Sequence, residues 1–160
     1  MPTQAMDRWM ARPPDVCTVY VGPQDIARFA LAIGATDQAH FDAAVARSRG
    51  FADVVAPALF YVSLRTGVFN LVPPEDLHAE GTPLRDVPPI PFTQAMAGET
   101  HAELYRPFVA GDLVTCSRHP KSVSEKIGRS GKLTFVQFEY QYTGSDSRPI
   151  ATENFTRIFR

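Results

Sequence analysis

Residues 58–69 are apolar around most of the circumference of the helix that they would form. Alanine, leucine, phenylalanine, tyrosine and valine fill most of its positions, and Pro57 precedes them where a missing backbone N–H costs nothing. A surface helix normally has a polar face, so a helix that is apolar nearly all round is expected to be buried. The rest of the chain must therefore wrap it.

The second half of the chain has the period-two pattern of half-buried antiparallel strands. Polar residues at 137, 139 and 141 alternate with four apolar ones, Val136, Phe138, Tyr140 and Tyr142. Further strands are predicted within 98–105, 114–117 and 150–159, with turns at 128–131 and 144–147. One long buried helix followed by four or five antiparallel strands predicts an α+β fold in which the sheet curls around the helix.

Two shorter helices are predicted before the buried one. Ile26, Phe29, Ala30 and Ile33 form one apolar stripe, and Gly34 follows as a C-terminal cap. Residues 41–48 predict a second short helix, and residues 17–21 a short strand. The chain of 160 residues is expected to be a single domain, 1–160, in which 1–16 form an irregular N-terminal segment.

Composition narrows the class of protein. A net charge of -1 argues against a nucleic-acid-binding surface, and no apolar run approaches the length of a membrane span. The N-terminus lacks the layout of a signal peptide, so we expect a cytoplasmic protein. Cys17 and Cys116 are far apart in sequence and predict reduced, buried thiols. The four histidines lack zinc-ligand spacing, so no metal site is predicted.

Several short segments, in order, resemble the MaoC-like dehydratase family. They are residues 29–34 (FALAIG), 37–42 (DQAHFD), 50–51 (GF), 54–57 (VVAP) with Phe60, and 105–112 (YRPFVAGD). The resemblance covers roughly residues 18–160, and is greatest to the subgroup of mycobacterial-type (3R)-hydroxyacyl dehydratase subunits.

The resemblance implies a hotdog fold, a central helix wrapped by an antiparallel sheet, paired across a sheet edge as a homodimer or as a heterodimer with a second hotdog chain. It implies the chemistry of an (R)-specific enoyl-thioester hydratase or 3-hydroxyacyl-thioester dehydratase of fatty acid metabolism. The substrate would be an acyl-CoA or an acyl carrier protein thioester. No cofactor is implied beyond the CoA or phosphopantetheine that forms part of the substrate.

Active members of the family carry an aspartate and a histidine in a Gly-Asp-x-Asn-Pro-x-His motif, which supply the acid and base that hydration needs. Gly34 and His40 match this motif, whereas Ala35 stands at the aspartate position and Asp37 at the asparagine position. Two hypotheses follow. Either Asp37 replaces the missing carboxylate beside His40, or the chain is a catalytically impaired acyl-binding subunit whose partner carries the acid and base.

Further candidate site residues follow from the expected thioester substrate. The backbone N–H of Ala58, at the start of the buried helix, would stabilise the thioester oxygen. Phe41 and Phe60 would line the acyl site, and Arg65 and Arg106 would meet a phosphate or carboxylate of the substrate. For each, an ordinary structural role is the alternative. A hotdog thioesterase is a third possibility, but it would need a carboxylate on the central helix, and residues 58–69 contain none.

Overall fold

The computed structural model describes residues 4–69, 71–129 and 131–160. The helices are α1 (Gln4–Met10), α2 (Pro23–Ala32), α3 (Ala43–Ser48) and α4 (Tyr61–Phe69), joined by the 3-10 turns η1 (Gln38–His40), η2 (Ala58–Phe60), η3 (Pro74–Asp76) and η4 (Leu84–Asp86). The strands are β1 (Asp15–Tyr20), β2 (Ala95–Leu104), β3 (Leu113–Gly128), β4 (Gly131–Thr143) and β5 (Pro149–Phe159). Within the described ranges, no helix is long and apolar enough to cross a membrane.

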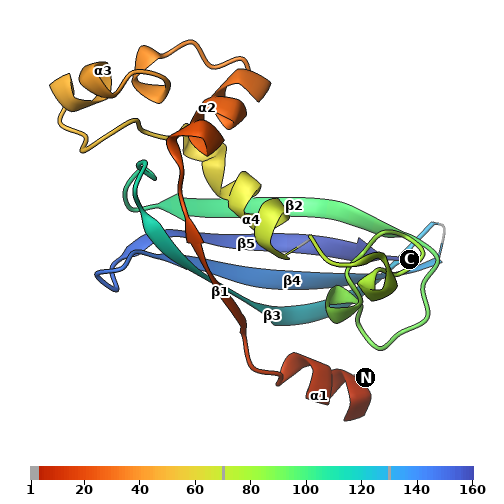
Figure 1. Cartoon of the computed structure of the whole chain (residues 1–160). Coiled ribbons are helices and arrows are strands. Elements are labelled where there is room, and N and C mark those ends of the chain that lie inside the picture. Colours follow the sequence, from red (N-terminus) through yellow and green to blue (C-terminus); the bar gives the residue numbers. More distant parts are fainter. Residues whose placement is uncertain (1–3, 70, 130) are drawn as a thin grey trace.

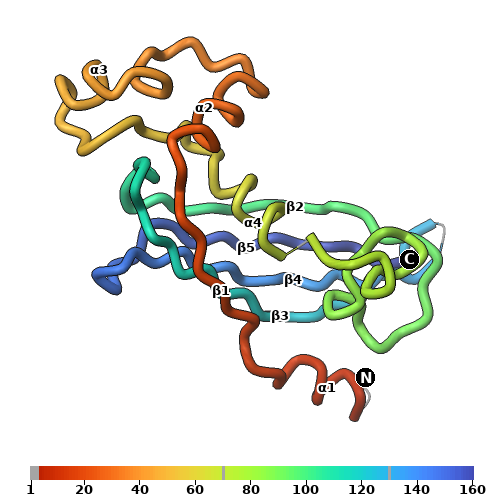
Figure 2. Tube along the Cα trace, viewed as in Figure 1, coloured from red at the N-terminus to blue at the C-terminus, as the bar shows by residue number. Residues whose placement is uncertain are grey.

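The five strands form one antiparallel sheet in the order β1-β3-β4-β5-β2. The long strands β3, β4 and β5 occupy its centre, and β1 and β2 are its two edges. Figures 1 and 2 show α4 lying across one face of this sheet, with α2 and α3 together beyond the N-terminal end of α4. This arrangement matches the predicted α+β layout of a helix against a curled antiparallel sheet.

The core lies between α4 and the inner face of the sheet. The alternation in β4 is confirmed, because its predicted inward residues are all buried: Val136, Phe138, Tyr140 and Tyr142. From α4, Tyr61, Leu64 and Phe69 are buried against them. Phe69 packs edge-on against Tyr140 with ring centroids 5.6 Å apart, a favourable geometry for two aromatic rings.

The central helix is less completely wrapped than its sequence predicts. It begins with the 3-10 turn η2 and continues as α4, so the predicted boundaries 58–69 are confirmed. However, Thr66 and Gly67 are exposed, and Leu59 in η2 is 55% exposed. The sheet covers one side of the helix, because five strands of a single chain do not close around it.

The N-terminal segment differs from its expected irregular form. Residues 4–10 form α1, and β1 begins at Asp15, within the segment 1–16. Trp9 explains why this short helix is held, since its ring packs edge-on against Phe138 of the core at 6.0 Å. Met6 of α1 is buried as well, and two anchored residues in so short a helix leave no extended periodic pattern in the sequence. Of the turn predicted at 128–131, Ser130 lies outside the described residues.

Candidate functional site

His40 lies at the end of η1, in the loop that joins α2 to α3. Gly34 ends α2 in the left-handed conformation (φ 69°), and Asp37 then caps η1 through the backbone N–H of Ala39 at 2.9 Å. The loop is held against the segment before the central helix, because Val55 N donates to Ala39 O at 3.0 Å. This contact places His40 close to the chain that leads into η2.

Val55 also fixes the ring of His40 through a second hydrogen bond. Its Nδ1 lies 2.6 Å from the carbonyl oxygen of Val55. Because a carbonyl oxygen can only accept, Nδ1 carries the hydrogen, and Nε2 of the neutral ring is left as a proton acceptor. The ring is half-buried beside Phe41, with centroids 6.3 Å apart. An oriented imidazole with a basic Nε2 is a suitable group for moving a proton.

The Asp37 carboxylate is already engaged on the surface of the loop. Besides capping η1, it forms an ion pair with Arg49, whose Nη1 is 2.7 Å from each carboxylate oxygen. The backbone hydrogen bond from Ala39, together with Arg49, lowers the pKa of Asp37. A general base works best with a pKa near the operating pH, so these contacts make Asp37 a weaker base.

The other two acidic residues in the loop region 35–53 are also occupied. Asp42 caps α3 by accepting from the N–H groups of Ala44 and Val45. Asp53 pairs with Arg47 at 2.9 Å and accepts from the backbone N–H of Val54. The carboxylates nearest His40 in sequence therefore serve the loop's own structure.

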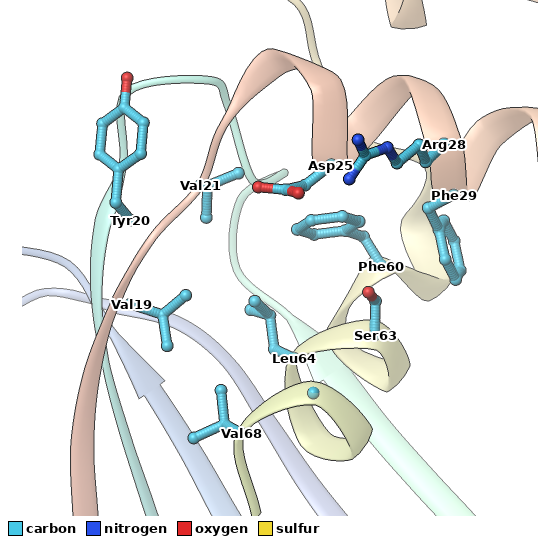
Figure 3. Close-up of a pocket in the computed structure, with 11 residues that line it drawn as sticks. Val19, Tyr20, Val21, Asp25, Arg28, Phe29, Phe60, Ser63, Leu64 and Val68 are labelled. Carbon is cyan, nitrogen blue, oxygen red and sulfur yellow. The ribbon is translucent and has the colours of Figure 1, made fainter. Parts of the chain in front are cut away.

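A cavity of about 410 Å³ lies between β1, α2 and α4 (Figure 3). This volume falls within the range of small-molecule pockets, roughly 300–1,000 Å³. Most of its wall is apolar. The lining residues are Val19, Tyr20, Val21, Asp25, Arg28, Phe29, Phe60, Ser63, Leu64, Gly67 and Val68.

Helix α4 contributes two small residues, Ser63 and Gly67, to this cavity, alongside Leu64 and Val68. Ser63 and Gly67 are four residues apart and so lie on one face of the helix. A Cβ atom built on Gly67 would have no neighbour within 4 Å, so no packing contact requires glycine there. We did not predict either residue as part of the site. Their signal in the sequence is a pair of small residues at i and i+4 in an otherwise bulky apolar helix.

Phe60 lies in the wall of this cavity, and Phe41 does not. The Phe60 ring packs edge-on against Phe29 at 5.6 Å and tilted against Phe108 at 5.8 Å. Phe41 instead stays beside His40 at the end of η1. Ala58 opens η2 three residues after Val55, the residue that bonds to His40, and the Ala58 N–H has no partner within the turn.

Arg65 turns toward the sheet rather than toward the cavity. Its guanidinium bonds to Glu153 of β5 and stacks over the Phe155 ring, 4.2 Å from the centroid. Glu153 is completely buried and also accepts from the Tyr142 hydroxyl at 3.2 Å. Burial raises the pKa of Glu153, while Arg65 opposes that shift. In this chain Arg65 therefore joins α4 to β5, which differs from its predicted contact with a substrate anion.

Arg106 is likewise occupied by an internal partner. Its two terminal nitrogens bond to the two carboxylate oxygens of Asp112 at 2.8 and 2.9 Å, and Asp112 also accepts from the Val109 N–H. The hydrogen bond to Asp112 raises the pKa of Arg106. A bidentate pair of this kind fixes the turn that leads into β3.

A second buried ion network lies near the other end of α4. Arg118 is completely buried and bonds to Asp86 at 2.9 Å and to Asp15 at 2.7 Å, with its guanidinium over the ring of Phe69. We did not predict this network from the sequence. Arg118 follows the inward positions 114 and 116 of β3, so a charged residue in register with buried ones is the signal that could have revealed it.

Comparisons with known proteins agree with this fold. The family model for the FAS1-like dehydratase domain region matches residues 8–153. A UPF0336 protein of Clavibacter michiganensis is 34% identical over 105 residues, which make up 65% of this chain and 63% of that protein.

Two solved structures have the same fold. One is the HadBC (3R-hydroxyacyl-ACP dehydratase) complex of Mycobacterium tuberculosis, with a TM-score of 0.70, 18% identity and 99% of each chain covered. The other is a MaoC-like dehydratase, with a TM-score of 0.71, 21% identity, and 94% of this chain and 43% of that chain covered. The chain thus belongs to the FAS1-like dehydratase-region family and has the hotdog fold of MaoC-like dehydratases.

Proposed function

We propose that this chain is the acyl-thioester-binding subunit of a heteromeric (R)-specific enoyl-thioester hydro-lyase. One observation carries the proposal: the loop around His40 offers no carboxylate that is both free and placed to act as a base. Ala35 stands where active relatives have aspartate, and Asp37 is held by Ala39 and Arg49. Hydration of an enoyl thioester needs both an acid and a base, so a second chain would supply the missing group.

The cavity supports the binding part of the proposal. An acyl chain is apolar and flexible, and it gains affinity mainly by leaving water. The wall made by Val19, Phe29, Phe60 and Leu64 offers a surface of the matching kind. The thioester carbonyl would then lie near the start of η2, where the N–H of Ala58 is free of an intrahelical partner.

The edge strand β2 supports the partner part of the proposal. It runs from Ala95 to Leu104, pairs with β5 on one side only, and has almost all of its side chains exposed. An open edge of this length can take a strand from another chain. The likeness to a chain of the heteromeric HadBC complex makes a second hotdog chain the natural candidate.

His40 favours a second candidate function, a stand-alone hydratase. Its bond to Val55 leaves Nε2 as a proton acceptor, so the imidazole alone could shuttle the proton between water and substrate. In that case a homodimer would be sufficient. The two candidates differ in whether the purified chain turns over substrate by itself.

The test uses the pure chain, first alone and then with a second hotdog chain that carries an intact aspartate and histidine. We expect the chain alone to bind acyl-CoA without hydrating crotonyl-CoA, and activity to arise on reconstitution. Hydration by the chain alone that is lost in a folded His40→Ala variant would replace the subunit proposal with the stand-alone enzyme. Failure to bind any acyl-CoA, alone or with the partner, would refute both.

A further inference from the structure

The two cysteines of the chain, which are 99 positions apart in sequence, meet across two strands. Cys17 of β1 and Cys116 of β3 are direct partners in the antiparallel register. Opposed residues in such a pair project to the same face of the sheet. Here that face is the inner one, since Cys116 is completely buried and Cys17 packs against the core beside it. The Cys17 thiol lies 3.8 Å from the carbonyl oxygen of Cys116.

The spacing of strand partners is close to what a disulfide needs. Directly opposed residues have Cα atoms roughly 4.5–5.5 Å apart, and disulfides span roughly 4.4–6.8 Å. Their Cβ atoms, at roughly 4.5–5.5 Å, must approach by about 0.7–1.7 Å to reach the mean separation of about 3.8 Å in disulfides. Strand β1 can supply this movement because it is an edge strand that pairs with β3 alone. A bond formed with some strain is also easier to reduce.

We propose that Cys17 and Cys116 form a reversible cross-strand disulfide when the protein meets a hydroperoxide. The Cys17 thiolate attacks one peroxide oxygen, the O–O bond breaks, and a sulfenic acid and one water (for hydrogen peroxide) are produced. The Cys116 sulfur then attacks the sulfenic sulfur and displaces its oxygen as a second water. Two thiols are oxidised and one peroxide is reduced, with the two thiol protons leaving in the water.

The order of attack follows from exposure. Cys17 is partly exposed and is the thiol that an oxidant reaches first, whereas Cys116 is completely buried and resolves the intermediate from within. Burial raises the pKa of both thiols, that of Cys116 to about 12. Because the thiolate is the reactive form, oxidation should be slow and should mark sustained exposure to peroxide.

The bond would affect the cavity wall. Val19 and Tyr20 of β1 and Val21 just after it line the cavity, two to four residues beyond Cys17. A bridge to β3 would fasten this wall to the sheet at a point next to the site. This consequence does not depend on which of the two candidate functions holds.

The test treats the folded full-length chain with hydrogen peroxide and follows its thiols. We expect the titre of free thiols to fall from two to zero, the monomer to lose the mass of two hydrogen atoms, and a proteolytic fragment to join Cys17 to Cys116. Dithiothreitol should restore both thiols. Sulfinic or sulfonic acids on separate cysteines, bonds between chains, or two unreacted thiols under conditions that oxidise the unfolded chain would each overturn the proposal.

Two variants and one further measurement complete the design. Cys17→Ala and Cys116→Ala each remove one partner, so neither folded variant can lose two hydrogens within one chain. Hydrogen exchange of the backbone amides of β1 should slow several-fold on oxidation of the native sequence. If the amides of β1 exchange at the same rate in the disulfide-bonded protein, the bond does not hold the cavity wall more firmly.

Discussion

Gly67 offers a direct test of what the cavity holds. A glycine inside a helix lowers stability by about 0.5–1 kcal/mol relative to alanine. No packing contact requires glycine at this position, because a Cβ atom added there would have no neighbour within 4 Å. Gly67 lies in the wall of the cavity of about 410 Å³. We infer that its missing side chain leaves room for the acyl chain, and that filling this room shortens the chain that can bind.

The size of the effect follows from the volume that a side chain would take. Gly67→Leu adds about four carbon atoms, which would exclude three or four methylene groups of a bound acyl chain. At about 0.8 kcal/mol per buried methylene, the loss is about 3 kcal/mol, or roughly 100-fold in Kd for long chains. Short chains that do not reach Gly67 should keep their affinity. Gly67→Ala adds one carbon and should cost long chains no more than about fourfold.

The assay is calorimetric titration with acyl-CoA thioesters of increasing chain length, on the chain alone and with its partner. Thr66→Leu is the matched control, because it places the same side chain on the neighbouring exposed position outside the cavity wall. Helix propensity predicts that Gly67→Leu folds at least as stably as the native chain. If the ratio of long-chain to short-chain affinity is the same in Gly67→Leu as in Thr66→Leu, the cavity is not the acyl site.

Three further predictions concern the charged residues. Arg65→Met should lower the free energy of unfolding by about 3–5 kcal/mol, because Glu153 stays buried without its cation. Burial raises the pKa of Glu153, so the folded state holds the Glu153 proton more firmly than the unfolded state does. The loss of unfolding free energy in Arg65→Met, measured by urea denaturation, should therefore grow as the pH rises from about 5 to about 8. Asp37→Asn should change the hydration rate of the active complex by less than about threefold, whereas a loss of ~10²-fold would identify Asp37 as the base. Arg106→Ala should destabilise the chain by about 1–2 kcal/mol, because Asp112 loses its partner. The ratio of its affinities for acyl-CoA and acyl-pantetheine should not change. Weaker binding of acyl-CoA alone would assign Arg106 to the CoA phosphates.

The fold was predictable because its main elements follow a regular period. The alternation through Val136 and Tyr142 reports a half-buried strand, which is confirmed. The apolar run 58–69 reports a helix, and its bounds are confirmed although it is only partly buried. The strand order was not predictable in the same way. Period-two patterning shows which side chains face inward, but it does not show that β2 pairs with β5 at the far edge, since that depends on contacts between distant segments.

In the candidate site, too, features with a local sequence signal were predictable and contacts between distant segments were not. The loop of His40 and the helix start at Ala58 are local features, and the loop bonds to Val55, three residues before Ala58. Pairings across the sheet have no local signal. Arg65 meets Glu153 across 88 positions of sequence, so its lone charge in an apolar helix could be noticed but its partner could not be named. The meeting of the two cysteines was missed for the same reason.

Helix α4 has the strongest apolar signal in the sequence, yet in the single chain it is covered on one side. Tyr61 and Phe69 pack against Tyr142 and Tyr140 of the sheet, whereas Leu59 in the preceding turn is 55% exposed and Gly67 borders the cavity. Apolar surface of this kind on a helix is unfavourable in water unless a ligand or another chain covers it. An acyl chain against the Gly67 side and a second hotdog chain beyond Leu59 would together bury the helix as its sequence predicts. The mismatch between an apolar sequence and a half-exposed helix is therefore an independent argument for the binding subunit proposed above.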